Sequence, residues 1–342
     1  MDVLCLDGSP REIGRGLGRR AAVAVREAVF ATAQFQGLRQ WLGGDRLTAL
    51  EAAARRHFPE AVAEIEGIAE GAGVGFAEIF LWNCRGDLAG LDRSSEDGCT
   101  TIMVPATDGR PATIAHNEDG APAFADHGFL ARVAPARGLG FTAFCYPGML
   151  PGHAFAVNDA GLVQTINNIR PRDLAVGVPR HVISRAVLAA DGIDAALALL
   201  RREDRASGFH HALGEAASGR LYSVEAPASG CVAVAVTAPM AHANHLIQPA
   251  FATLAQDVSP SSAARQRRAD ALLAEGGADD PLAILFDRAD AELPILCRGE
   301  RDGDDSHTLA TALFHFGAGR IDWSVHHGPD RAPVYGDKPG LD

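Results

Sequence analysis

The chain has 342 residues, which is long enough for one large domain or two medium ones. Of these residues 47% are hydrophobic and 22% charged, a composition that excludes extensive disorder. The formal net charge of −12 argues against nucleic acid and anionic membranes as partners, because binding to phosphate needs clustered Lys and Arg. The basic clusters are short, and the cluster of Arg265, Arg267 and Arg268 falls in a helical pattern, so we interpret them as solvated helix faces.

Neither a targeting segment nor a membrane span is predicted. The first residues contain no basic start followed by a long apolar run, and no apolar run is long enough to cross a bilayer. We therefore expect a soluble, cytoplasmic protein. Its six cysteines are scattered without a Cys-x-x-Cys pair, which indicates neither a disulfide framework nor a zinc site built from thiolates.

The first 98 residues are expected to be mainly helical. Apolar spacing predicts a helix from Pro10 to about Gly43 and two more over residues 47–57 and 60–70. Residues 79–84 form a short apolar piece suited to docking on the next part of the chain. The polar stretch that ends at Gly98 predicts an exposed, flexible loop.

After Cys99 the pattern changes to short apolar segments separated by turn residues. Hairpins are predicted around Asp108-Gly109, Asn158 to Gly161 and Ser218-Gly219. Further strands are predicted over residues 231–237, 308–316 and 320–326, and helices over 180–190, 192–202, 261–275 and 280–286. Successive hairpins with segregated helices favour an α+β fold with antiparallel sheets.

A thiol at the first position of a strand, directly after a loop, has one specific chemical use. If the peptide bond between Gly98 and Cys99 is cut, Cys99 carries both a thiol and a free α-amine. The reference pKa of that amine, about 7.7 to 8.0, lies close to that of a thiol, about 8.5, so the amine can act as the general base. Gly98 lacks a Cβ, which permits a strained or positive-φ backbone and leaves its carbonyl open to attack. From these residues alone, a buried structural cysteine is the simpler interpretation.

The chain as a whole resembles the acyl-coenzyme A:isopenicillin N (6-aminopenicillanate) acyltransferase family of N-terminal nucleophile cysteine hydrolases. The motifs that carry the resemblance follow one another in order: DGCTT, HNED, AVNDAGLVQTINN, LYSVEAP, AHANH and LPILCR. The resemblance implies a four-layer αββα sandwich and autocatalytic cleavage before the cysteine. Residues 1–98 would be a helical pro-segment that becomes the small subunit, and 99–342 the catalytic large subunit, packed together as one structural domain.

The resemblance also implies roles for single residues. Cys99 matches the nucleophile, Asp119 matches an acid that orients the nucleophile or its amine, and Asn244 matches the donor to the oxyanion. Asn117 is implied to position substrate or backbone, and Glu225 to have a structural role around the site. Without the resemblance, the Asn and Asp of HNED would be interpreted as a polar hairpin end.

Two departures from the family pattern bear on the substrate. Ser306-His307-Thr308 stands where relatives have a Ser-Arg step, so a cationic contact would be missing or pH-dependent at His307. Beside the HNED motif, Glu118 and Gly120 replace aromatic residues, so penicillin chemistry is not carried over to this chain.

No cofactor and no metal are expected. His242 and His245 flank Asn244 with a spacing of three, but no third ligand is visible at a useful spacing. We expect these histidines to be hydrogen-bonded scaffold residues around Asn244.

The sequence thus predicts an autoproteolytically activated N-terminal cysteine amidohydrolase or acyltransferase. It would act on a small N-acyl amide or acyl thioester through an acyl-thioester intermediate, with neither nucleic acid nor membrane as a partner. Two alternatives stay open: an uncleaved, non-catalytic binding or scaffold protein on the same fold, and a Cys-His hydrolase that is not cleaved. Hydrolysis versus acyl transfer and a homo-oligomeric state also stay open.

Overall fold

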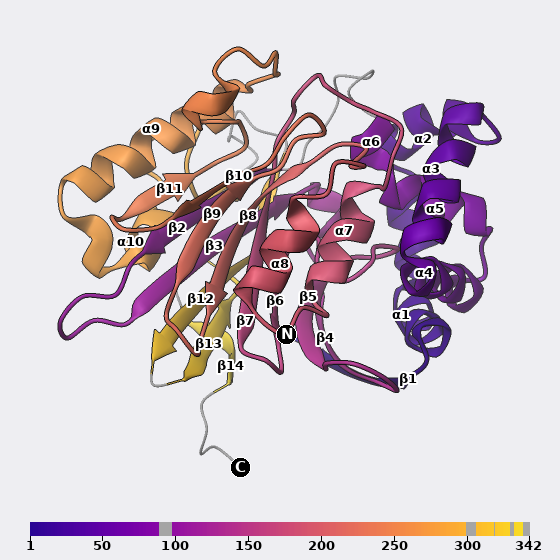
Figure 1. The fold of residues 1–342 in the computed structure, drawn as a ribbon, viewed down its shortest axis with the longest axis horizontal. Helices are drawn as coiled ribbons and strands as arrows, with labels where there is room; N and C mark the ends of the chain where they lie inside the picture. The colour runs from indigo at the N-terminus through magenta and orange to yellow at the C-terminus, as the bar shows by residue number, and fades with distance from the viewer. Residues whose placement is uncertain (89–97, 299–305, 318, 329–331, 338–342) are drawn as a thin grey trace.

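Two stacked β-sheets form the centre of the molecule, and helices cover both outer faces (Figure 1). The structure is a computed structural model that describes residues 1–88, 98–298, 306–317, 319–328 and 332–337. The predicted loop before Gly98 falls mostly on residues 89–97, outside the described residues. The layers confirm the predicted α+β fold class and its αββα arrangement.

The first sheet has eight strands in the order β1-β4-β5-β6-β7-β8-β9-β10. Their bounds are β1 (Val3–Gly8), β4 (Phe129–Pro135), β5 (Phe141–Cys145), β6 (Phe155–Asn158), β7 (Leu162–Asn168), β8 (Phe209–Glu215), β9 (Leu221–Glu225) and β10 (Val232–Ala235). Neighbouring strands are antiparallel apart from β1 and β4, which pair in parallel. The predicted mainly helical segment therefore begins with a strand. The six residues of this strand, VLCLDG, alternate between exposed and half-buried at the sheet edge. So short an apolar run does not by itself distinguish a strand from the start of a helix.

The second sheet has six antiparallel strands in the order β11-β2-β3-β12-β13-β14. Their bounds are β11 (Met240–His242), β2 (Gly98–Val104), β3 (Ala112–Gly120), β12 (His307–Gly317), β13 (Arg320–His326) and β14 (Pro333–Asp337). Every residue of β2 and β3 is buried, because the first sheet covers one face and helices cover the other. The hairpin predicted at Asp108-Gly109 is confirmed, and Gly109 has φ +87°, a conformation that favours glycine.

The helices form the two outer layers. Before β2 the chain forms α1 (Pro10–Ala24), α2 (Ala33–Leu38), α3 (Asp45–His57), α4 (Pro59–Ala72), α5 (Phe76–Asn83) and α6 (Arg85–Leu88), and later α7 (Arg180–Val187), α8 (Ile193–Leu200), α9 (Pro260–Ala274) and α10 (Pro281–Leu285). The single helix predicted over residues 10–43 is divided, since a π-helical turn over Val25–Val29 ends α1. Among the described residues, no helix is both long and apolar enough to cross a membrane.

Close packing between α1 and α4 depends on glycine. A Cβ on Gly14 would lie 2.0 Å from the Glu64 carbonyl oxygen, and one on Gly71 would lie 2.2 Å from that of Arg15. The two backbones can approach this closely only because these positions lack side chains. One hydrophobic core includes residues of these helices and of both sheets, so the first 88 residues pack as part of the same unit.

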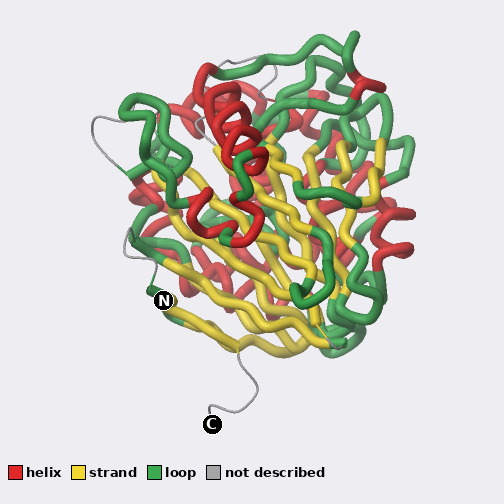
Figure 2. Tube along the Cα trace, turned by 90° about the vertical axis from the view of Figure 1, so that its left-hand side faces the viewer, coloured by secondary structure: helices red, strands yellow, loops and turns green. Residues whose placement is uncertain are grey.

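Alternation along β2 decides which way each side chain points. Ile102 and Val104 face α9 and α10, where they pack with Ala269 and Leu285. Thr101 faces the first sheet, because its hydroxyl contacts β7. Since side chains two residues apart share a face, Cys99 also faces the space between the sheets. Figure 2, viewed from the side of α9 and α10, shows the strands running side by side behind these helices.

Candidate active site

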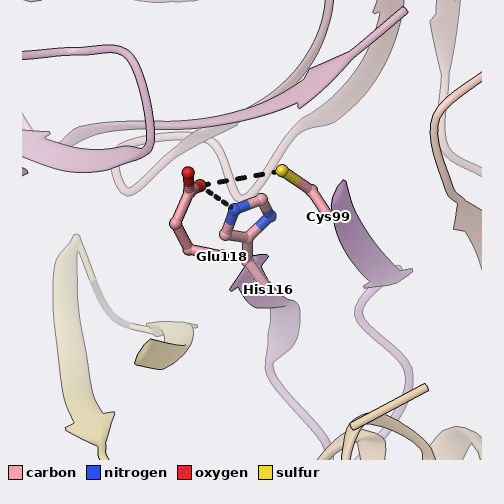
Figure 3. Close-up of side chains that lie close together, drawn as sticks. All are labelled: Cys99, His116 and Glu118. Carbon is pink, nitrogen blue, oxygen red and sulfur yellow. Dashed lines mark hydrogen bonds and ion pairs between the residues drawn. The ribbon is translucent and has the colours of Figure 1, made fainter. Parts of the chain in front are cut away.

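The Cys99 side chain lies between the two sheets, beside an acid and a histidine of the neighbouring strand (Figure 3). Cys99 is paired with Glu118 in the β2–β3 ladder and is 4% exposed. Its thiol donates to Glu118 Oε2 at 3.8 Å, and the same oxygen lies 3.0 Å from His116 Nε2. His116 and Glu118 share this face of β3 because they are two residues apart.

The thiol is protonated in this environment. Burial raises the pKa of Cys99 well above its ordinary value, and the negative charges of Glu118 and Asp119 raise it further. Backbone hydrogen bonds from Asn168 and Asp119 act in the opposite direction and lower that pKa. Attack by this sulfur therefore requires a group that takes up its proton.

The backbone of Cys99 is held on both sides by groups from distant parts of the chain. Its N–H donates to Asn244 Oδ1 at 2.9 Å, and its carbonyl oxygen accepts from Arg265 Nη1 at 2.5 Å. Arg265 Nη2 also donates to Asn244 Oδ1 at 2.7 Å. Asn244 thus lies against the nitrogen that cleavage would convert into an α-amine.

Arg265 was missed by the sequence interpretation, which was wrong for this residue. It lies on α9 and is only 1% exposed, and it also donates to Thr100 Oγ1 at 2.9 Å and to Ser261 Oγ at 3.1 Å. Arg267 on the same helix is exposed, as predicted. Helical spacing could have indicated that Arg265 is buried, because it lies four residues after Ser261 and therefore on the same face of the helix. Arg265 also brings a positive charge to a site where the sequence suggested that one was missing.

Asp119 lies on the opposite face of β3 from Glu118. It pairs with Gly98 in the ladder, and its Oδ1 accepts from Thr308 Oγ1 at 2.6 Å. A Cβ built on Gly98 would lie 3.3 Å from Asp119 Oδ2 and 3.2 Å from Arg265 Nη2. The structure therefore places Asp119 against the residue before the predicted cleavage bond.

Gly98 does not use the positive φ that the lack of a Cβ permits. Its φ lies outside the left-handed region, because the residue is the first of strand β2 and pairs with β3. A glycine fits here because space is short beside Arg265 and Asp119.

Asn117 and His307 lie near this end of the second sheet. Asn117 Nδ2 donates to the carbonyl oxygens of Leu285 at 2.8 Å and Ile295 at 3.3 Å, and its Oδ1 accepts from Thr311 Oγ1 at 2.7 Å. These contacts tie the α10 region to the sheet. His307 is the first residue of β12, is half-buried and pairs with Gly120.

The loop that carries Asn244 is fixed by buried polar contacts. Glu225 Oε1 lies 2.9 Å from His242 Nε2 and accepts from the Ile247 backbone N–H at 2.7 Å. Ser262 Oγ accepts from the Asn244 backbone N–H at 2.9 Å and lies 2.8 Å from His245 Nδ1. Asn244 Nδ2 directs one of its two N–H groups at the Asn168 carbonyl oxygen, 3.0 Å away.

Cys99, His116 and Glu118 are the residues of this site that could bind a metal ion. The sulfur, the imidazole nitrogen and the carboxylate oxygen all lie within 4.8 Å of one another, and Zn²⁺ accepts this combination of S, N and O ligands. None of these three residues is among the histidines, His242 and His245, whose spacing in the sequence could suggest metal ligands. The sequence does contain a signal for the proximity of Cys99 and Glu118. Cys99 lies nine residues before Asp108 and Glu118 nine residues after Gly109, which makes them partners across the predicted turn.

A hollow of about 1000 Å³ lies elsewhere, on the outer side of the first sheet. Residues of α1, α4, α7 and α8 line it, among them Ile13, Glu64 and Arg185. None of the predicted site residues lines it, so it is separate from the Cys99 site.

Comparisons with known proteins point to one family. The family model for acyl-coenzyme A:6-aminopenicillanic acid acyl-transferase matches residues 106–329, a stretch that starts after Cys99 and includes Asp119 and Asn244. A beta-alanyl-dopamine/carcinine hydrolase of Drosophila melanogaster is 33% identical over 161 residues, 42% of this chain and 41% of that protein. The chain therefore spans well under half of that relative.

A second relative aligns over nearly the whole chain. The 40 kDa form of acyl-coenzyme A:6-aminopenicillanic-acid-acyltransferase from Emericella nidulans is 26% identical over 326 residues, 92% of this chain and 89% of that protein. Among solved structures, a conjugated bile acid hydrolase variant from Clostridium perfringens covers 67% of this chain and 89% of its own, at 12% identity and a TM-score of 0.42. Penicillin V acylase from Agrobacterium tumefaciens covers 68% and 84%, with the same identity and TM-score.

Proposed function

Because the chain belongs to the acyl-coenzyme A:6-aminopenicillanic acid acyl-transferase family, we propose that Cys99 is the nucleophile of an amidohydrolase or acyltransferase activated by cleavage of the Gly98–Cys99 bond. One observation carries the proposal. The site holds both the thiol and the backbone nitrogen of Cys99, the first against Glu118 and the second against Asn244. Cleavage turns that nitrogen into an α-amine that is already positioned by Asn244 and lies on the same residue as the sulfur.

In the cleaved enzyme the α-amine takes the thiol proton and the sulfur attacks the substrate carbonyl. The oxyanion accepts hydrogen bonds from the second N–H of Asn244 Nδ2 and from a backbone N–H. The protonated amine then donates its proton to the leaving amine, and an acyl-thioester enzyme remains. Arg265 supports this chemistry by holding Asn244 Oδ1, which aims the amide of Asn244.

Water or a second amine then releases the acyl group from Cys99. Water makes the protein an amidohydrolase, and an amine makes it an acyltransferase. We favour hydrolysis of a small N-acyl amide, because water is always present and no coenzyme A motif is readable in the sequence. A panel of acylated amines that includes N-beta-alanyl-dopamine, carcinine and 6-aminopenicillanate derivatives identifies the substrate class.

A Cys-His hydrolase without cleavage is the second candidate function. The imidazole nitrogen of His116 and the sulfur of Cys99 lie within 4.8 Å of each other. An uncleaved Cys99 therefore has a histidine close enough to act as its catalytic partner. In that case the full-length chain itself catalyses the reaction.

Intact mass and N-terminal sequencing of freshly purified protein, with turnover measured on the same sample, test the proposal. Two fragments that meet at Gly98 and Cys99, together with amide turnover, support it. A single full-length mass with thiol-dependent turnover supports the Cys-His hydrolase. A single mass without turnover indicates the binding or scaffold protein and overturns both enzymatic proposals.

Replacing Gly98 with proline is expected to leave the precursor uncleaved. Proline fixes φ and removes the N–H of a residue in the β2–β3 ladder, so the carbonyl that must be attacked is held in a different position. Intact mass after a long incubation measures the effect. Gly98→Ala is the milder comparison, since its Cβ would lie 3.2 Å from Arg265 Nη2, and slowed cleavage is expected. Complete cleavage of Gly98→Pro would contradict the proposed geometry of attack.

A further inference from the structure

Sulfur, imidazole and carboxylate groups converge on two neighbouring strands of the second sheet. Cys99 on β2 and His116 and Glu118 on β3 offer one ligand atom each, and these atoms lie within 4.8 Å of one another. We propose that the three residues bind a divalent cation that prefers sulfur, such as Zn²⁺, and that the bound ion occupies the sulfur and halts both cleavage of the Gly98–Cys99 bond and turnover. The inhibition rests on the proposed function, and the binding site does not.

The spacing of the ligand atoms is close to that of a zinc site. Zinc binds sulfur at about 2.3 Å and nitrogen or oxygen at about 2.0 to 2.2 Å, which places the ligands of a tetrahedral site about 3.3 to 3.6 Å apart. Cys99 Sγ lies 3.8 Å from Glu118 Oε2, and that oxygen lies 3.0 Å from His116 Nε2. Figure 3 shows the three side chains directed at one another, so small side-chain rotations bring all three to an ion between them.

The hydrogen bonds of His116 turn the correct ring nitrogen into the site. Asn167 Nδ2 donates to the His242 carbonyl oxygen at 3.0 Å, so Asn167 Oδ1 is the atom that faces Thr101. An amide oxygen only accepts, so the Thr101 hydroxyl donates to it at 2.7 Å. The hydroxyl oxygen then accepts from His116 Nδ1 at 2.8 Å. Metal-binding histidines are oriented in this way, with one nitrogen donating to the protein and the other, here Nε2, left for the metal.

The charges of the ligands suit a divalent cation. Metal ligands bind deprotonated, so the ion releases the thiol proton to solvent and takes Cys99 as a thiolate. The thiolate and the Glu118 carboxylate together balance the two charges of Zn²⁺, and buried charges are stable when they are compensated in this way. Arg265 does not fill this place, because its guanidinium binds the Cys99 carbonyl oxygen and Asn244 Oδ1.

Glu118 makes the site a property of this chain. It stands where the family pattern has an aromatic residue, and an aromatic ring there would leave only sulfur and imidazole as ligands. The sequence by itself predicts no metal, since Cys99 and Glu118 are 19 residues apart and meet through the β2–β3 pairing. Sulfur and imidazole select Zn²⁺ over Mg²⁺ and Ca²⁺, which prefer oxygen ligands.

Metal binding is measured on the freshly purified full chain, with Co²⁺ as a spectroscopic probe and Zn²⁺ as its competitor. Co²⁺ bound to a thiolate gives a sulfur-to-metal charge-transfer absorption in the near ultraviolet, which nitrogen and oxygen ligands alone do not give. We expect a single Co²⁺ per chain with this absorption, displaced by Zn²⁺ and unaffected by excess Mg²⁺. A wild-type chain without the absorption would overturn the site.

Variants assign the absorption to its ligands. Cys99→Ala should abolish it. Glu118→Gln should weaken binding by more than about a hundredfold, because groups that merely orient a metal ligand already contribute about 10- to 100-fold. Thr101→Val removes such an orienting group from His116, so it should weaken binding by about 10- to 100-fold and keep the absorption. An unchanged absorption in Cys99→Ala, or unchanged affinity in a folded Glu118→Gln chain, would contradict the proposal.

Cys5→Ala is the control, since Cys5 is an exposed thiol on the edge strand β1. It should bind Co²⁺ like the wild type. Because the substitution is on the surface, this result does not depend on whether a variant of the site folds. Loss of the absorption in Cys5→Ala would show that the ion binds at the surface, and would overturn the site at Cys99.

Inhibition is measured in the wild type, with cleavage followed by intact mass in freshly synthesised chain and turnover on the amide panel. Both rates should fall by half at the Zn²⁺ concentration that half fills the site, and a chelator should restore them. Zn²⁺ that fills the site and slows neither reaction would overturn the inhibition. A chain that is cleaved and active but gives no Co²⁺ absorption refutes the metal site alone, whereas an uncleaved, inactive chain that gives it refutes the proposed function and the inhibition.

Discussion

Cys99→Ala is expected to give one full-length chain with no amide turnover and nearly unchanged stability. The substitution removes the sulfur that attacks the Gly98 carbonyl and, later, the substrate, so both reactions lose their nucleophile. The loss of one small buried atom costs about 1 kcal/mol of folding free energy, too little to unfold the chain. Intact mass, turnover on the amide panel and the unfolding midpoint measure the three effects.

A matched control is available in Cys145, which is buried in β5 of the other sheet. Burial raises the pKa of its thiol too, so Cys145→Ala removes a similar inert sulfur. It should be cleaved and active. Fragments beginning at residue 99 in the Cys99→Ala chain would show that a different group cuts the bond.

Arg265→Met is expected to lower both stability and the cleavage rate. Methionine replaces the aliphatic part of the side chain but removes the charged donor to the Cys99 carbonyl, to Thr100 Oγ1 and to Asn244 Oδ1. Losing charged hydrogen bonds to buried acceptors should reduce the free energy of unfolding by about 3 kcal/mol. Cleavage should slow as well, because Asn244 is then held only through its other contacts. Chemical denaturation and the time course of intact mass provide the two measurements.

Arg267→Met is the control for this change, since Arg267 lies on the same helix and is exposed. It should change the free energy of unfolding by no more than about 0.5 kcal/mol, and the cleavage rate by no more than the factor that corresponds to that energy. Equal behaviour of the two variants would mean that the contacts of Arg265 contribute nothing to the site.

Much of the second sheet was predictable because its information is local. Alternating apolar residues around Asp108-Gly109 predict the β2–β3 hairpin, which the structure confirms. The helices over residues 45–57 and 59–72 form where the apolar spacing predicts helices over 47–57 and 60–70. By contrast β1 was missed, because its apolar run is only four residues long and its pairing partner β4 lies more than 100 residues later in the chain.

The sequence by itself determined the class of fold, the junction of Gly98 and Cys99 at the start of a strand, and the set of residues that resemble the family's site. These features depend on turn chemistry and side-chain period, which act over a few neighbouring residues. Only the tertiary structure decided which groups meet the cysteine. It brings Asn244 to the backbone of Cys99 across 145 residues and buries Arg265 between them, because layer packing, and not local pattern, sets contacts between distant elements. It also placed Asp119 and Glu118 on opposite faces of one strand, and so put Glu118 rather than Asp119 beside the sulfur.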